Sequence, residues 1–286
     1  MKRTWEAMTT IRAFRARAAT AVLATVLAPA ATLLPVTASA QSSAPWTFQA
    51  TLNGWFPDIG GRTRFADAAG RGDFEIDIGN ILDKLEFTFQ GTFDARSGRF
   101  GVLADVVYMS VGQAESTTRG GSIGGISIPV DARLSTEFDM KSRIWTAAGY
   151  YRAIETPGVT LDVVGGLRYT DVTQTLDWSL SGNLGPIPAP SRTGRGRASV
   201  THWDAIVGVR GRASLTPDNT WFVPWYIDIG TGDSDFTWQA MAGIGYAFKW
   251  GEAVAGWRYL GYDMPDSSRL TDISFSGPMV GASFRW

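Results

Sequence analysis

The chain's single histidine, His202, is the side chain best suited to proton transfer near neutral pH. Asp204 follows two residues later, so in a β-strand the two side chains would share one face about 7 Å apart. A hydrolase would also need a nucleophile or a positioned water, but Ser199 and Thr201 fall on the opposite parity. We therefore favour two ordinary polar residues in an enclosed interior, and we keep a hydrolytic site at His202 and Asp204 as an alternative.

The motif Gly-x-Arg occurs three times, at residues 166–168, 208–210 and 256–258. If these segments are strands, each glycine shares a face with its arginine. One interpretation is a ladder of arginines that screens anions. The other is that glycine makes room for a long arginine that pairs with a carboxylate. We favour the second because acidic side chains are as numerous as basic ones on the same face.

The composition excludes several classes of site. With no cysteine and one histidine, the chain offers no thiolate or multi-histidine site, so we expect no metal and no cofactor. A net charge of −1 provides no basic surface for nucleic acid. Aromatic residues make up 12% of the chain, and their positions along the sequence indicate the fold.

The segment DFTWQAMAGIGYAFKW (235–250) alternates apolar residues with polar or small ones. Because successive side chains of a strand point to opposite faces, one face of this strand is entirely apolar. That face carries aromatic residues at both ends and Ala and Ile between them, an order typical of the lipid-facing band and girdles of a membrane barrel. A soluble sandwich has no reason to bracket small aliphatic residues with aromatic ones.

The same alternation recurs from Trp46 onward and predicts an all-β fold, a transmembrane antiparallel up-and-down β-barrel. We expect ten strands, with eight or twelve as alternatives; a hairpin within 61–78 would make twelve. In one strand, the charged Lys141 and Arg143 share a parity with Trp145, which leaves its lipid-facing side open. The ten expected strands are 46–56, 85–95, 99–112, 135–153, 158–176, 198–215, 220–230, 235–250, 253–263 and 272–286.

The connections alternate between short turns and longer segments, of which 57–84, 113–134 and 177–197 are the longest. Short periplasmic turns and long external loops are typical of outer-membrane barrels. We expect the Pro- and Gly-rich residues 182–197 to form a surface loop, with binding of lipopolysaccharide as a less favoured alternative. Helical spacing in 78–85 predicts a single helical turn.

Residues 1–40 have the pattern of a secretory signal peptide. Three arginines precede the apolar run 18–36, and the small residues Ala38-Ser39-Ala40 precede Gln41. We expect cleavage after Ala40, which leaves residues 41–286 as one outer-membrane β-barrel domain.

Several segments resemble those of proteobacterial outer-membrane β-barrel proteins, of the small monomeric type similar to outer-membrane protein A. The resemblance spans nearly all of residues 41–286. It implies location in the cell outer membrane, contact with outer-membrane lipid and lipopolysaccharide, insertion by the barrel-assembly machinery and a monomeric state. It also implies that Phe284 and Trp286 form the signal read by that machinery. The segments are NILDKLEFTFQGTFDARSGRFGVLADVVYMSVG (80–112), VGGLRY (164–169), WQAMAGIGYAFKW (238–250), GWRYLGYDM (256–264) and GPMVGASFRW (277–286).

The alternation also assigns charges of both signs, in equal number, to the barrel interior. Barrels of about 8 strands are filled by side chains, whereas about 16 strands enclose a channel. Because an unpaired charge in a narrow lumen is costly, balanced charges predict ion pairs across it. The residues that we predict to line the lumen are Glu86, Asp105, Arg143, Asp162, Arg168, His202, Asp204, Arg210, Arg212, Asp228 and Arg258.

These observations predict an integral outer-membrane barrel without enzymatic activity. Its role would be structural or that of a narrow passive channel, with a lumen largely filled by paired charges. A small-solute porin with an arginine-lined pore and a hydrolase that uses His202 and Asp204 stay as alternatives.

Overall fold

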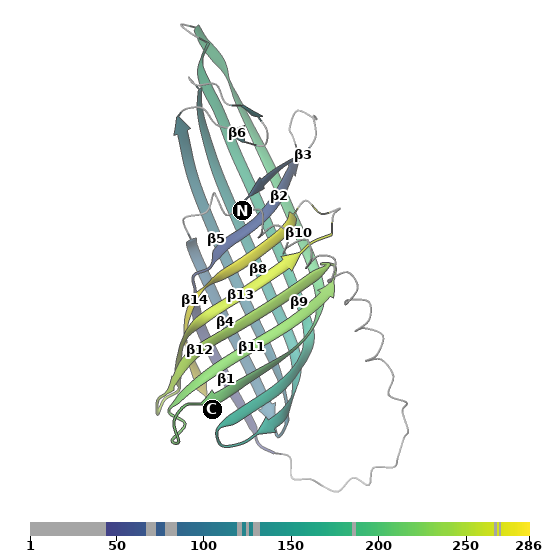
Figure 1. Ribbon diagram of the computed structural model, residues 1–286, viewed down its shortest axis with the longest axis vertical. Coiled ribbons are helices and arrows are strands. Elements are labelled where there is room, and N and C mark those ends of the chain that lie inside the picture. The colour runs from purple at the N-terminus through teal and green to yellow at the C-terminus, as the bar shows by residue number, and fades with distance from the viewer. Residues whose placement is uncertain are drawn as a thin grey trace, which may run out of the picture. The chain divides into compact units, whose positions relative to one another are not determined.

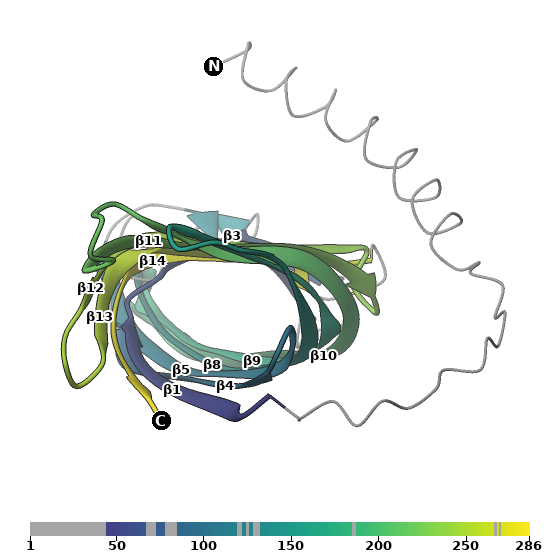
Figure 2. The same cartoon turned by 90° about the horizontal axis from the view of Figure 1, so that it is seen from below.

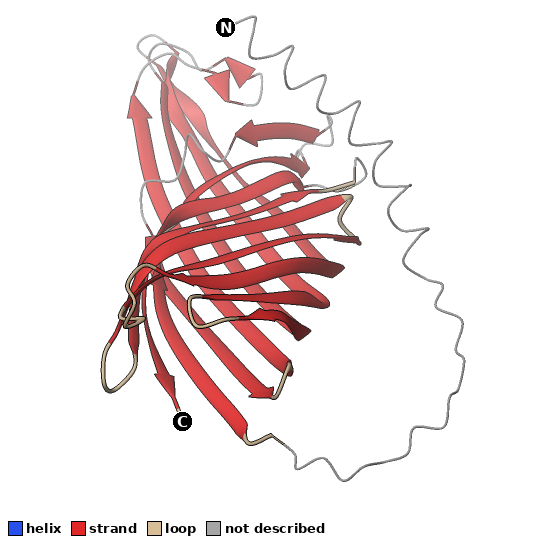
Figure 3. Cartoon of the chain, turned by 60° about the horizontal axis from the view of Figure 1, so that its bottom comes forward, coloured by secondary structure: helices blue, strands red, loops and turns tan. Residues whose placement is uncertain are grey.

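A computed structural model describes most of the expected barrel as β-strand (Figure 3). Within the part of the chain that it describes, no helix is long and apolar enough to cross a membrane. The predicted signal peptide and residues 78–84 of the predicted helical turn lie outside that part. The described residues are 44–66, 73–77, 85–118, 122–123, 126–127, 132–184, 187–265, 268 and 270–286.

Ten antiparallel strands form a closed up-and-down barrel, which confirms the predicted fold class and strand number (Figures 1 and 2). The first barrel strand pairs with the last, from Gln49 opposite Arg285 to Trp55 opposite Met279, and this pairing closes the ring. Closure satisfies the backbone groups of both strands, as a structure within lipid requires. The strands are β1 (Trp46–Trp55), β4 (Leu85–Ser97), β5 (Phe100–Thr118), β8 (Ala132–Glu155), β9 (Val159–Leu184), β10 (Ile187–Ser214), β11 (Trp221–Gly232), β12 (Phe236–Ala247), β13 (Glu252–Asp263) and β14 (Leu270–Arg285).

The hairpin considered for a twelve-stranded barrel exists, but it lies beside the ring. It consists of β2 (Asp58–Ala66) and β3 (Asp73–Asp77). β2 pairs with the first half of β14, whereas β1 pairs with the second half. The ring therefore keeps ten strands, and the hairpin extends the wall at the end opposite the short turns. A further small hairpin joins β6 (Ser122–Ile123) to β7 (Ile126–Ser127).

Three neighbouring strands are far longer than a membrane requires. β8, β9 and β10 contain 24, 26 and 28 residues, although about 9–11 residues carry a strand across a bilayer. They continue past the ends of β11, β12 and β13, at the end opposite the short turns (Figure 1). We call this projecting part of the wall the extension.

The prediction of a loop at 182–197 is wrong, because most of these residues belong to the β9–β10 hairpin of the extension. Pro188 and Pro190 lack an N–H for the ladder, and prolines in strands lie at edges or bulges. The β9–β10 pairing shifts register between Ala189 and Arg192, next to these prolines. The ladder on either side continues without interruption, so the prolines cause a local irregularity and not a loop.

A belt of aromatic residues follows part of the outer wall near the short turns. Rings contact one another across β11, β12 and β14, with centroid separations of 4.6–5.3 Å. The series runs through Trp221, Tyr246, Phe248, Trp250 and Phe284. Contacts of this kind place the amphipathic rings at one level around the wall, as a membrane interface requires.

A second belt follows the other boundary of the barrel. Tyr169 and Trp203 lie 4.9 Å apart between ring centroids, and Trp238 and Tyr259 lie 4.3 Å apart. On β12 the two belts are separated by the stretch from Trp238 to Tyr246, about 26 Å along the strand and about 20 Å along the axis at the usual tilt. This spacing is close to the lipid-facing band of about 25 Å found in outer-membrane barrels.

Trp286 lies at the seam where the barrel closes. Its backbone N–H donates to the carbonyl of Phe48 (3.0 Å), and its carbonyl accepts from the N–H of Phe48 (2.9 Å). The two rings stack with centroids 6.1 Å apart. Trp286 therefore joins the last barrel strand to the first, in addition to its predicted part in an assembly signal.

We predict that Trp286→Ala slows appearance of the closed barrel more than Trp221→Ala does. Both residues lie on the exposed side of the wall near the short turns, but only Trp286 stacks across the seam. The measurement is a time course of the heat-modifiable gel form in outer-membrane fractions. Equal rates for the two variants would contradict a special role of Trp286 in closure.

Candidate functional site

The lumen holds three successive groups of charged side chains on the inward face of the strands. We name them by distance from the short turns. The turn-end tier is Arg212, Glu252 and Arg285; the middle tier is Asp94, Arg152, Asp162 and Arg210; the deep tier is Asp105, Arg168, Asp228 and Arg258.

The deep tier contains the most buried ion pairs. Arg168 on β9 donates to Asp228 on β11 at 2.5 Å, and neither side chain is exposed. Arg258 on β13 reaches across the lumen to Asp105 on β5 at 2.8 Å. Gln239 accepts from both arginines, at 2.9 Å from Arg258 and 3.4 Å from Arg168. These bonds join opposite walls into one network.

In the middle tier, one arginine is shared by two carboxylates. Arg210 on β10 donates to Asp94 on β4 (2.6 Å) and to Asp162 on β9 (3.0 Å). Asp162 in turn accepts from Arg152 at 2.7 Å. The hydroxyl of Tyr150 donates to Asp94 (2.7 Å), and its ring lies 4.0 Å below the Arg210 guanidinium carbon. The charges of this tier balance.

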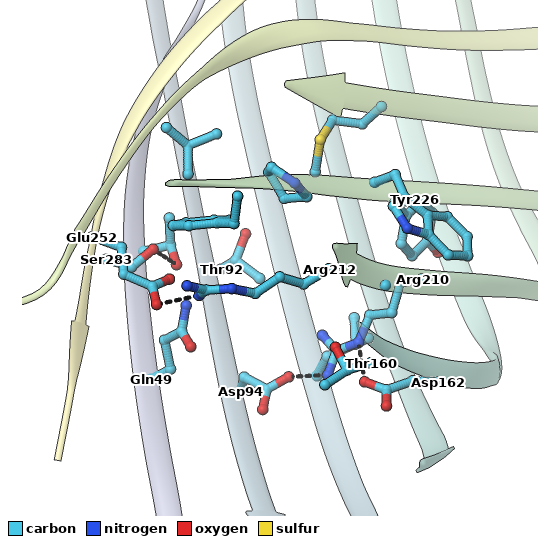
Figure 4. Close-up of a pocket in the computed structure, with 18 of the residues that line it drawn as sticks. Gln49, Thr92, Asp94, Thr160, Asp162, Arg210, Arg212, Tyr226, Glu252 and Ser283 are labelled. Atoms are coloured by element: carbon cyan, nitrogen blue, oxygen red, sulfur yellow. Dashed lines mark hydrogen bonds and ion pairs between the residues drawn. The ribbon is translucent and has the colours of Figure 1, made fainter. Parts of the chain in front are cut away.

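The turn-end tier reverses this sharing, because two arginines meet one carboxylate. Arg212 from β10 donates to Glu252 on β13, and Arg285 on β14 donates to the same carboxylate oxygen at 3.4 Å. Gln49 on β1 also accepts from Arg285, at 2.9 Å. Figure 4 shows Arg212 extending across the lumen toward Glu252, with Gln49 beside the contact.

The β10–β11 turn holds the rim of this tier. Arg212 donates to the main-chain oxygen of Asn219, which adopts a left-handed conformation with φ of 58°. Hydrogen bonds from the hydroxyl groups of Thr216 and Thr220 lower the pKa of Asp218 to about 2. Asp218 therefore keeps its charge, and the turn keeps its hydrogen bonds, at a more acidic pH than an aspartate with the ordinary pKa would allow.

A cavity of about 500 Å³ lies within the turn-end and middle tiers. Residues of the turns after β8 and β10 line it, so it opens toward the short turns. Gln90, Gln239 and Arg258 line its inner end. The cavity is thus a pocket in the lumen, and the deep tier forms its base.

Beyond the deep tier the lumen is mainly apolar, with a few buried polar side chains such as Thr170, Gln174 and His202. Side chains from seven barrel strands, with Ile59 of the hairpin, form one buried cluster that we call the plug. Its central members are at most 1% exposed. They are Trp55, Val107, Met109, Phe138, Met140, Ile144, Leu260, Ile273 and Phe275. The prediction of a lumen filled mainly by paired charges is therefore correct only for the half nearer the short turns.

The plug reveals a change of polarity along the long strands. On β8, Trp145 and the residues after it present an apolar outer face, while Thr146 and Arg152 point inward. Before Trp145 the pattern inverts, so Glu137, Asp139, Lys141 and Arg143 point outward and Phe138, Met140 and Ile144 inward. Odd-numbered residues of β8 face outward on both sides of Trp145, so the inversion reflects a change in what surrounds the outer face. Beyond the second aromatic belt the outer face meets water, and the core is inside.

This inversion explains the one wrong assignment among the predicted lumen residues. Arg143 lies on the exposed outer face of β8 beside Trp145, not in the lumen. The side chain of Glu86 lies outside the described part of the structure. The structure places the other nine inward: Asp105, Asp162, Arg168, His202, Asp204, Arg210, Arg212, Asp228 and Arg258.

His202 and Asp204 both point inward, but the structure gives them different surroundings. Asp204 accepts from the backbone N–H (3.0 Å) and the hydroxyl (2.7 Å) of Ser234. It thereby anchors the β11–β12 turn to the wall. Neither ring nitrogen of His202 meets a hydrogen-bonding partner among the described residues. The carboxylate therefore serves the turn and does not orient the imidazole as a hydrolytic dyad would require.

All three arginines of the Gly-x-Arg motifs pair with carboxylates, as favoured from the sequence, but the glycines have another reason. A Cβ at Gly166, Gly208 or Gly256 would lie 2.2–2.4 Å from a carbonyl oxygen of the neighbouring strand. These glycines allow adjacent strands to approach closely. Glycine is therefore required at these positions by the close approach of the strands and not by the space that the arginine needs.

The alternation along 85–95 and 272–286 already assigns Asp94 and Arg285 to the inward face. Sequence reasoning missed two residues of the network, namely Arg152 and Glu252. Both lie within four residues of a short turn, in stretches where the alternation is brief. Their parity still agrees with the inward set, since Arg152 aligns with Thr146 and Glu252 with Arg258. Extending the parity to the ends of the strands would have included them.

No protein-family model and no curated protein matches this chain. Solved structures with a similar fold include the outer membrane protease OmpT from Escherichia coli, with 9% identity over 86% of this chain and 98% of that one and a TM-score of 0.43. Neisserial surface protein A is 11% identical over 86% and 100%, with a TM-score of 0.29. Ail of Yersinia pestis, in complex with a heparin analogue, is 12% identical over 84% and 99%, with a TM-score of 0.28.

We predict that Arg168→Met destabilises the barrel by about 3–5 kcal/mol, because it leaves the buried Asp228 carboxylate without its opposite charge. The double variant Arg168→Met with Asp228→Leu should recover most of that loss. The measurement is the urea unfolding midpoint of the protein folded in detergent, followed by tryptophan fluorescence.

The control is Arg195→Met, which removes the exposed pair with Asp177 on the extension. An exposed pair is worth at most about 1 kcal/mol. An Arg168→Met midpoint no lower than that of the control would show that the deep tier is not needed for stability.

Proposed function

We propose that this chain is an integral outer-membrane barrel with a structural role, whose lumen is closed to solutes. The outer wall between the belts supports the membrane location. Leu167, Val207 and Ile244 on three different strands are 53–56% exposed. A continuous apolar surface of this kind is costly in water but is matched by lipid chains.

The orientation follows from the two ends of the barrel. Short turns in outer-membrane barrels face the periplasm, and long segments face outward. The extension would then stand above the outer leaflet with its charged side chains in water. Lys141 and Arg143 would lie just beyond Trp145, at the level of the lipopolysaccharide head groups.

The plug is the observation that carries the closed lumen. Trp55, Phe138, Met140, Ile144 and Phe275 come from three strands and are each at most 1% exposed. Ions and small polar solutes would have to lose their hydration to cross such a region, which costs several kcal/mol for each polar group. Side chains also fill the interior of other barrels of about this strand number.

The network beneath the plug argues against an arginine-lined pore. A selective pore presents an excess of one sign at its constriction. Here Arg168, Arg210 and Arg258 each end on a carboxylate, at 2.5–2.8 Å. The ion pairs bind opposite walls together, so their role on this proposal is to hold the barrel closed and stable.

We predict no stepwise conductance for the refolded protein in planar bilayers. Combined Phe138→Ala, Met140→Ala and Phe275→Ala should produce a leak, because these substitutions thin the plug. Asp162→Asn, which disturbs the middle tier alone, should stay closed because the plug lies above it.

Reproducible conductance of the unmodified protein would refute the closed lumen. Conductance in Asp162→Asn but not in the plug variant would assign the seal to the charges and not to the plug. Each variant is first checked for the heat-modifiable gel shift of a folded barrel.

A further inference from the structure

The pocket at the short-turn end is open to solvent and has no part in the proposed seal. Its volume of about 500 Å³ lies in the range of sites for small molecules. Its wall combines apolar side chains with hydroxyl and amide side chains from β1, β4 and β14. These include Thr47, Gln49, Thr51, Thr92 and Ser283.

The charges that line this pocket are unequal. Six arginines line it, against four carboxylates, and Glu155 at the rim pairs with two of the arginines. One positive charge is therefore left over. The arginines are Arg96, Arg152, Arg210, Arg212, Arg258 and Arg285, and the carboxylates are Asp94, Asp105, Asp162 and Glu252.

The surplus lies in the turn-end tier. The middle tier is balanced, and Arg258 has its own partner in Asp105. Arg212 and Arg285 share the single carboxylate of Glu252. Two guanidinium groups that converge on one carboxylate attract a further anion, because each presents five N–H donors in a fork that fits oxyanions.

Neighbouring side chains hold Arg212, Arg285 and the adjacent Ser283 in place. The Arg212 guanidinium carbon lies 3.4 Å from the centre of the Phe222 ring. Arg285 donates to Gln49, and Ser283 shares a hydrogen bond with Thr51 at 2.8 Å. An arginine that is already oriented loses less side-chain entropy when it binds a ligand.

We propose that this pocket binds a small oxyanion, a phosphate or a carboxylate, between Arg212 and Arg285. Glu252 competes with the ligand for the same donors. It holds the two arginines together when the pocket contains no anion. This proposal goes beyond the closed barrel, because binding and conductance are measured separately and either can fail alone.

The test is calorimetric titration of inorganic phosphate into the folded barrel, in an uncharged detergent at low ionic strength. We expect saturable binding that falls at least tenfold in Arg212→Gln and in Arg285→Gln. Glu252→Gln should bind more tightly, because it frees both arginines. Arg195→Gln, on the extension, is the matched control and should bind like the unmodified protein. Titrations with acetate and pyrophosphate separate the two ligand classes.

An anion site predicts weaker phosphate binding in the two arginine variants and tighter binding in Glu252→Gln. A purely structural network does not predict these opposite effects. Loss of binding in Glu252→Gln, equal binding in all variants, or no saturable binding of phosphate or acetate would overturn the proposal. Should Arg212→Gln fail to fold, Arg285→Gln still decides, since the Arg285 side chain is 53% exposed and carries little of the fold.

Discussion

A side chain that carries charge must face water or an opposite charge, and this constraint shapes the whole wall of the barrel. Between the two aromatic belts the outer face meets lipid, so charge is confined to the lumen and must be paired there. The contacts of Arg168 with Asp228 and of Arg258 with Asp105 satisfy that requirement across the interior. Beyond the second belt the outer face meets water, and charge moves outside.

The same strand therefore serves two environments. In β8 the membrane part is apolar outside and polar inside, and the extension is polar outside and apolar inside. The inward apolar residues of the extension form the plug together with apolar residues of β1, β5, β13 and β14 and with Ile59 of β2. On the proposed function, this arrangement separates two tasks, because the charged tiers hold opposite walls together and the plug excludes water. The pocket within the turn-end and middle tiers opens toward the short turns.

Period-two alternation was enough to predict the closed ten-stranded barrel, the lipid-facing residues and most of the lumen. It works because every membrane strand has one face in lipid, which tolerates no charge. The same rule failed for Arg143, since parity alone cannot locate the membrane boundary. Trp145 marks that boundary. Because Lys141 and Arg143 share its face, the sequence already indicated that the strand leaves the membrane there.

Other features depended on contacts between distant parts of the chain. Glu252 pairs with both Arg212 and Arg285, which come from strands that are far apart in sequence. Residue spacing therefore does not reveal these ion pairs. The β9–β10 hairpin of the extension was hidden by prolines and glycines that usually indicate a loop. The long ladder beyond the membrane forms because β8 and β9 support it over their full length.

On the proposed function, the lumen is open at the short turns and sealed above the deep tier. The chain has no cysteine, so single cysteines can be placed at will. Ser214 lines the pocket, and Ser142 is fully buried among the plug residues. With a small charged methanethiosulfonate reagent on the folded protein in detergent, we expect Ser214→Cys to react rapidly and Ser142→Cys to stay unreacted. Comparable reaction rates at the two positions would contradict the sealed lumen.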